Sequence, residues 1–118
     1  MNKYEKGKKG EDIACVFLEK NGIKIIKKNY FTKYGEIDLI GIQNSTIIFI
    51  EVKLRTNNNF GYPAESINFN KKKKIYNAAE IFLLENCYKD VDCRFDVICL
   101  FEKKNIYQVK WFKNQYFD

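Results

Sequence analysis

The chain of 118 residues contains no histidine. This absence excludes the Ser-His-Asp and Cys-His catalytic triads, and every class of nuclease whose general base is a histidine. It also excludes histidine as a metal ligand and leaves hard oxygen ligands, of the kind that Mg²⁺ or Mn²⁺ prefers.

Cysteine is sparse, and its four copies show no C-x-x-C spacing. Without histidine, a zinc site would need all four of them. Free buried cysteines are common in cytosolic proteins, so the pattern favours free thiols over a zinc site or a disulfide framework. The four are Cys15, Cys87, Cys93 and Cys99.

Long apolar runs are absent as well, because no stretch of about 18 apolar residues is present to span a bilayer. Residues 1–10 are polar and basic, without the apolar stretch of a signal peptide. We therefore expect a cytosolic protein with no membrane partner. The length suits a single domain, residues 1–118, and a hydrophobic fraction of 46% with 31% charged residues indicates a folded globular chain.

The formal net charge of +6 fits a polyanionic partner such as a nucleic acid. Nearly all of the positive charge is lysine, and the only arginines are Arg55 and Arg94. A bias towards lysine, asparagine and isoleucine is also expected from an AT-rich genome, so the charge alone does not identify the partner.

The spacing of apolar residues predicts helices over residues 8–21 and 70–86, and a short helix over 63–67 that begins at the single proline. Strands are predicted over 23–32, 36–43, 46–54, 94–102 and 106–112, the last at a sheet edge. Leaving the short helix aside, the order is α-β-β-β-α-β-β. It indicates an α/β fold with a mixed central sheet flanked by helices, in which the long second helix connects two parallel strands.

Asp38, Glu51 and Lys53 place charge inside strands that are otherwise apolar. Because a strand alternates its faces, Glu51 and Lys53 must share one face, and Asp38 could face them from the neighbouring strand. Two carboxylates and an ammonium at one place could hold Mg²⁺ beside a phosphodiester and position a water. The alternative is a structural ion pair, solvated at the end of the sheet.

Glu11 lies one helical turn before Ala14 and Cys15, towards the buried edge of the first helix. A helix packed on the sheet could direct this carboxylate towards the strand acids. The alternative is an acid of the first turn that stabilises the helix dipole.

Several short motifs occur along the chain in a fixed order: Gly10-Glu11-x-x-Ala14, Gly35-Glu36-Ile37-Asp38-Leu39-Ile40, Phe49-Ile50-Glu51-Val52-Lys53-x-Arg55, Phe60-Gly61, Lys71 and Arg94-Phe95-Asp96-Val97. In order and spacing these motifs resemble the YraN-type family of small bacterial proteins, from about Lys6 to Leu100. That family is similar in predicted fold to the PD-(D/E)XK nucleases, which include archaeal Holliday junction resolvases and restriction endonucleases. Ile37 stands where the proline of the PD signature would be.

The resemblance implies a restriction-endonuclease-like fold and a role for each matching residue. Asp38 and Glu51 would be metal ligands, with a third oxygen from the Val52 carbonyl. Lys53 would orient the attacking water or stabilise charge on the phosphate. Glu11 matches the helix acid that resolvases use near the metal.

Basic residues near these motifs are candidate phosphate contacts. Arg55 and Lys71 would lie at the rim of the site, with ordinary solvated surface as the alternative. Lysines at the start of a helix oppose the helix dipole, so the run at 71–74, which includes Lys72 and Lys74, suggests contact with a DNA backbone. Arg94 and Asp96 are expected to form a structural pair.

Aromatic residues could stack on unpaired bases, but packing in the core or an interface is the favoured interpretation. The candidates are Tyr30, Phe31, Tyr34, the 60–62 loop, Trp111, Phe112, Tyr116 and Phe117.

Together these features predict an endodeoxyribonuclease that uses Mg²⁺ or Mn²⁺ and acts on structured or branched DNA. The alternative is a nucleic-acid-binding or assembly factor that keeps the fold without catalysis. Phosphate contacts do not distinguish DNA from RNA. A resolvase-like role would require a homodimer, since a symmetric junction needs paired nicks.

Overall fold

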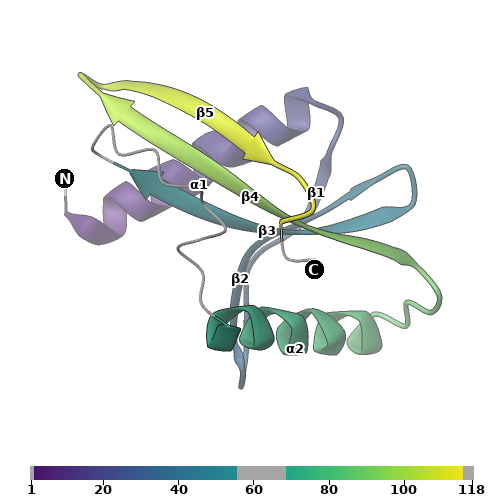
Figure 1. Cartoon of the computed structure of the whole chain (residues 1–118). Coiled ribbons are helices and arrows are strands. Elements are labelled where there is room, and N and C mark those ends of the chain that lie inside the picture. Colours follow the sequence, from purple (N-terminus) through teal and green to yellow (C-terminus); the bar gives the residue numbers. More distant parts are fainter. Residues whose placement is uncertain (1, 56–68, 116–118) are drawn as a thin grey trace.

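The computed structural model describes residues 2–55 and 69–115 (Figure 1). Helices and strands follow one another in the predicted order α-β-β-β-α-β-β. The elements are α1 (Lys3–Lys20), β1 (Lys24–Thr32), β2 (Gly35–Gln43), β3 (Thr46–Arg55), α2 (Phe69–Glu85), β4 (Asp92–Lys103) and β5 (Ile106–Phe112). The short helix predicted at 63–67, the 60–62 loop, Tyr116 and Phe117 lie outside the described residues.

The strands form one mixed sheet in the order β1-β2-β3-β4-β5. Neighbouring strands are antiparallel except for β3 and β4, which are parallel and are joined through α2. Both the mixed sheet and the parallel pair around the long second helix are therefore confirmed. β5 is an edge strand, as predicted.

The two helices cover opposite faces of the sheet, and each face has its own core (Figure 1). Along β3, Ile48 and Ile50 pack with α1, whereas Ile47 and Phe49 pack with α2. The apolar run in this strand is continuous because both of its faces are buried.

The first helix begins at Lys3 rather than at residue 8. Asn2 caps it, since its side-chain oxygen accepts a hydrogen bond from the Glu5 amide at 2.8 Å and its side-chain nitrogen donates to the Glu5 carboxylate at 3.0 Å. The apolar periodicity does not extend into these polar first turns, so the prediction placed the start too late. Neither α1 nor α2 combines the length and the apolar character that crossing a membrane requires.

A buried ionic network fixes the end of β5 to β4 and confirms the predicted pairing of Arg94 with Asp96. The Asp96 side chain is fully buried and accepts from the Arg94 guanidinium at 3.0 Å. It also accepts from Trp111 Nε1 at 2.9 Å and from the Asn114 amide at 3.1 Å. Trp111 further makes an edge-to-face contact with Phe17 of α1, so its role in packing is confirmed as well.

Candidate functional site

The candidate site lies where β2 and β3 part. Their antiparallel pairing runs from Gln43 and Thr46 to Leu39 and Ile50. Beyond that last pair β2 continues beside β1 and β3 continues beside β4. Figure 1 shows the β1–β2 hairpin curving away from β3 towards α2. Asp38 and Glu51 are the first residues past the last pair, so the two predicted acids stand at the opening.

The Asp38 side chain takes the place of the interrupted ladder. Its Oδ2 accepts a hydrogen bond from the Val52 amide of β3 at 2.8 Å. A carboxylate that accepts from the backbone of a neighbouring strand is held in one orientation, since the amide can move only with its strand. Asp38 is only 7% exposed, so it lies within the sheet and not at a solvated end.

A local change of backbone conformation turns β2 at this point. Ile37 packs in the α2 core and Leu39 in the α1 core, although a regular strand would put both on one face. On β1, Tyr30 pairs with Ile37 and Lys28 pairs with Leu39, so Asn29 stands opposite Asp38. The φ of 50° at Asn29 is in the left-handed region, which asparagine tolerates better than most residues. The bend therefore depends on Asn29 opposite Asp38.

The surroundings of Asp38 strongly favour its protonated form. Burial raises the pKa of Asp38 to about 8, and the adjacent Glu51 carboxyl contributes through a hydrogen bond and charge repulsion. The Val52 amide opposes the shift, because it stabilises the charged form of Asp38. In the metal-free protein, Asp38 therefore holds a proton at neutral pH.

Glu11 and Glu36 extend this group, and we call Glu11, Glu36, Asp38 and Glu51 the acidic cluster. Burial raises the pKa of Glu11, and the Asp38 charge adds to the shift while a hydrogen bond with Asn29 opposes it. Burial also raises the pKa of Glu36, again with a contribution from Asp38. The α1 helix is thus close enough for its carboxylate to interact with the strand acids.

The close approach of α1 depends on the glycine that precedes Glu11. Gly10 is buried, and a Cβ added to it would lie 3.3 Å from Leu100 Cδ1 on β4. Without a side chain at this position, the helix axis can lie nearer to the sheet. Gly10 therefore helps to place Glu11 beside the acidic cluster.

Basic side chains face the acidic cluster from β3 and α2. Glu51 and Lys53 are half-buried on the α2 side of β3, as strand alternation predicts, because Ile50 and Val52 pack on the α1 side. Burial and the neighbouring Lys71 ammonium lower the pKa of Lys53 to about 8, with a smaller contribution from Arg55. The charge of Glu51 opposes this shift. Lys53, Lys71 and Arg55 are therefore neighbours, and contact of Arg55 and Lys71 with phosphate stays a prediction.

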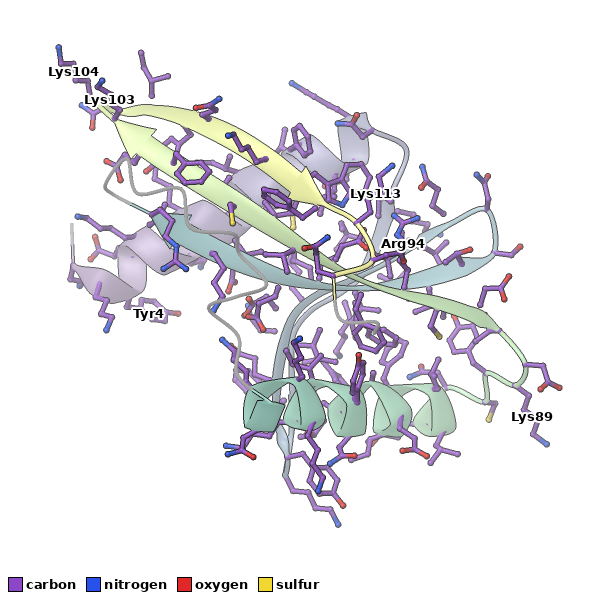
Figure 2. The ribbon with its side chains drawn as sticks, in the orientation of Figure 1. Tyr4, Lys89, Arg94, Lys103, Lys104 and Lys113 are labelled. Atoms are coloured by element: carbon purple, nitrogen blue, oxygen red, sulfur yellow. The ribbon has the colours of Figure 1, made fainter. Side chains whose placement is uncertain are left out.

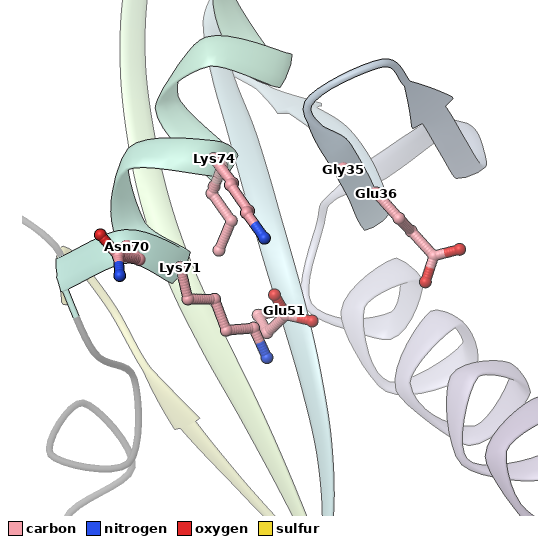
Figure 3. Close-up of a pocket in the computed structure, with 7 residues that line it drawn as sticks. Gly35, Glu36, Glu51, Asn70, Lys71 and Lys74 are labelled. Atoms are coloured by element: carbon pink, nitrogen blue, oxygen red, sulfur yellow. The ribbon is translucent and has the colours of Figure 1, made fainter.

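A pocket of about 520 Å³ lies between these two groups (Figure 3). Lys71 and Lys74 extend into it from α2 towards Glu51, and Glu36 stands on the other side. Lys72 does not line the pocket, since it lies on a different side of the helix from Lys71 and Lys74. The lining residues are Gly35, Glu36, Glu51, Asn70, Lys71, Lys74 and Ile75.

The donor set suits a hard divalent cation in its chemistry. Asp38 and Glu51 offer adjacent carboxylates whose repulsion a cation would relieve, and that repulsion adds to the burial that raises the pKa of Asp38. Among the residues that the structure describes, no group of three or more Cys, Asp or Glu side chains is arranged to hold an ion. The two carboxylates that fit are therefore those of Asp38 and Glu51, and ligation by the Val52 carbonyl and by Glu11 stays a prediction.

Two residues of the site were not identified from the sequence. Glu36 lies two residues before Asp38, and strand periodicity could have suggested it as a second acid beside the site. Asn29 gave no comparable signal, because its importance depends on which residue of β2 it faces, and pairing register is not visible in a single strand.

Comparison with known proteins agrees with the resemblance seen in the motifs. A UPF0102 protein of Clostridioides difficile is 48% identical over 98 residues, covering 83% of this chain and 86% of that protein. A UPF0102 protein of Caldanaerobacter subterraneus is 44% identical over 98 residues, covering 83% of this chain and 80% of the other. A UPF0102 protein of Persephonella marina is 38% identical over 110 residues, covering 93% and 94%. Residues 10–100 match the group described as Uncharacterised protein family UPF0102, and the chain belongs to this YraN-type family.

Proposed function

We propose that this protein is an endodeoxyribonuclease that uses Mg²⁺ or Mn²⁺ and hydrolyses phosphodiester bonds in structured or branched DNA. The observation that carries the proposal is the buried Asp38 carboxylate, held against Glu51 where β2 and β3 part, with Lys53 two residues further along the same strand face. Burial, with a contribution from the adjacent Glu51 carboxyl, raises the pKa of Asp38 to about 8, and such a buried acid costs stability at neutral pH, so the arrangement is better explained by function than by folding.

Each residue has a defined task in this reaction. Asp38 and Glu51, with the Val52 carbonyl, would hold the cation, which supplies positive charge to the phosphate undergoing attack. The Val52 amide orients Asp38 through its 2.8 Å hydrogen bond. Lys53, with a pKa of about 8, can hold or release a proton near neutral pH, which suits a group that orients water or neutralises phosphate charge.

Arg55, Lys71 and Lys74, which we call the basic rim, would supply contacts for the DNA backbone. Lys71 and Lys74 extend into the pocket opposite Glu36, and Arg55 lies close enough to affect Lys53. Cations on one side of a pocket and carboxylates on the other would place a phosphate between the basic rim and the metal ligands. The net charge of +6 agrees with a polyanionic substrate.

The order of elements supports the proposal by analogy. The α-β-β-β-α-β order with two acids and a lysine at the strand opening is similar to the core of the restriction-endonuclease-like proteins. Fold similarity supports a reaction class only together with the site, so the chemistry of Asp38, Glu51 and Lys53 remains the main argument.

Cleavage assays test the proposal directly. Branched, flapped, single-stranded and duplex DNA are incubated with Mg²⁺ or Mn²⁺ and with wild type, Asp38→Ala or Lys53→Ala protein. We expect losses of about 100-fold or more for both variants, as for other groups that stabilise a transition state. Asp92→Ala and Lys89→Ala are matched controls, because both residues are exposed, and Figure 2 shows Lys89 at one end of the molecule. Equal activity in all five proteins would refute the assignment.

The second candidate is a nucleic-acid-binding or assembly factor without catalysis. It is favoured by one observation, that the described side chains offer no three-ligand metal group. Calorimetry separates the two functions: the nuclease should bind Mn²⁺, and Glu51→Ala should abolish that binding. DNA affinity without any Mn²⁺ binding would support the binding factor instead.

A further inference from the structure

Two exposed aromatic side chains occupy the tip of the β1–β2 hairpin. Phe31 is 73% exposed and Tyr34 is 41% exposed. The sequence favoured packing in the core or an interface for these aromatics; the core is excluded for both, and the interface stays a prediction. Core packing is confirmed for Tyr30, which is 8% exposed and donates its hydroxyl to Glu85 at 2.9 Å. The hairpin uses Tyr30 to pack on α2, and it leaves the next aromatic residue in solvent.

The tip that presents these rings is held in one conformation. The Thr32 hydroxyl accepts from the amides of Tyr34 and Gly35 at 3.1 and 3.2 Å, and it donates to the Gly35 carbonyl at 2.9 Å. Gly35 has a φ of 147°, which side-chain-bearing residues rarely adopt. A Cβ at Gly35 would contact Lys74 Cβ at 3.7 Å, so the tip also rests on α2. Aromatic rings carried by such a fixed turn lose little conformational freedom when they bind a ligand.

The tip is continuous with the proposed site. Phe31 pairs across the hairpin with Glu36, which lines the pocket together with Gly35. A strand of DNA whose phosphate lay in the pocket would therefore bring the neighbouring nucleotide towards the hairpin tip.

The charge around the rings identifies the kind of partner. The Lys33 ammonium lies 5.2 Å from the centre of the Tyr34 ring, and the exposed Lys74, whose Cβ lies near Gly35, extends from there into the pocket. Isolated rings between cations do not form the continuous apolar patch that a protein partner would bury. Aromatic faces next to lysines suit single-stranded nucleic acid, which offers both bases and phosphates.

We propose that Phe31 and Tyr34 form a stacking surface for unpaired DNA bases, so that the site selects DNA that is single-stranded next to the bond placed in the pocket. The proposal rests on the proposed function only in taking the pocket as the place where the DNA backbone lies. It names a substrate feature, an unpaired nucleotide beside the cut, that the acidic cluster does not determine.

Binding without cleavage tests the stacking surface. A fluorescein-labelled single-stranded oligonucleotide and a blunt duplex are titrated in EDTA with wild type, Phe31→Ala and Tyr34→Ala. Each alanine variant should weaken single-strand binding by about 5- to 150-fold, the usual effect of losing one stacked base, while duplex affinity changes less than about 2-fold. Phe31→Trp should keep the wild-type affinity, because tryptophan retains an aromatic face.

The matched control is Tyr4→Ala, which removes an aromatic ring that is 78% exposed on α1. Both hairpin residues are exposed, so their variants should fold, and thermal unfolding verifies this. A second readout is an oligonucleotide containing 2-aminopurine, whose fluorescence should be quenched by wild type and not by Phe31→Ala. Unchanged single-strand affinity, or an equal loss with Tyr4→Ala, would overturn the proposal. So would a wild-type dimer that the hairpin variants dissociate without an effect on DNA binding.

The outcomes also separate this inference from the nuclease assignment. Stacking without cleavage by wild type would uphold the surface and refute the nuclease. Cleavage by wild type with an unchanged preference for flapped over duplex DNA in both hairpin variants would refute the surface alone.

Discussion

Replacing Asp38 with asparagine should make the metal-free protein more stable at neutral pH. Asp38 has its pKa raised from an ordinary 3.8 to about 8 in the folded protein, chiefly by burial and then by Glu51. Between these values the folded protein holds a proton that the unfolded chain releases. The contribution of this bound proton to stability is therefore greatest below pH 4 and declines as the pH rises to 8. Asparagine resembles the protonated acid at every pH, and its oxygen can still accept from the Val52 amide.

The magnitude follows from the same two pKa values. Each unit of difference corresponds to about 1.4 kcal/mol, and rearrangement of Glu51 or entry of water relieves part of the repulsion. We expect Asp38→Asn to gain about 2–4 kcal/mol in free energy of unfolding at pH 8, and much less at pH 4.

Urea denaturation in EDTA at pH 4, 6 and 8 measures the effect, with the exposed Asp92→Asn as the matched control. Addition of Mn²⁺ at pH 8 should then stabilise wild type but not Asp38→Asn, since ligand binding to the folded state raises its stability. An Asp38→Asn protein that is less stable than wild type, or a difference that does not change with pH, would refute the electrostatic reasoning.

Three further predictions concern the surroundings of the site. Asn29→Ala should lower the free energy of unfolding by about 1–2 kcal/mol, because alanine is strained at a φ of 50°, whereas Asn29→Gly should not incur that strain; thermal melts compare the two. Asp96→Ala should cost about 3–5 kcal/mol in urea denaturation, since it leaves a partly buried arginine and an indole N–H without their acceptor, against less than about 0.5 kcal/mol for Asp92→Ala. Lys71→Ala should raise the pKa of Lys53 from about 8 towards 10.5, measured by NMR titration of ¹³C-labelled lysine, and an unchanged pKa would show that the two ammonium groups are not neighbours.

Those parts of the structure that depend on local periodicity were predictable. Alternation along residues 46–54 placed Glu51 and Lys53 on one face of β3, and the structure agrees. The order of elements and the parallel pair around α2 followed from the same patterns and from the length of the connection. These features need information from only one segment at a time.

The features that were missed depend on contacts between distant segments or on polar groups. The bend at Asn29 requires knowledge of its partner Asp38, and the exposure of Phe31 depends on where the hairpin passes α2. The start of α1 depends on hydrogen bonds between Asn2 and Glu5, outside the apolar pattern. Residue types alone do not distinguish these outcomes from their alternatives.

The parting of β2 and β3 sets a limit on how this protein can evolve. Continued pairing beyond Leu39 and Ile50 would add ladder hydrogen bonds, each worth about 0.5–1.5 kcal/mol. Selection for stability alone therefore favours a sheet in which β2 and β3 pair along their whole length, with no space between Asp38 and Glu51. Stabilised variants obtained without an activity screen should accumulate substitutions at these positions first.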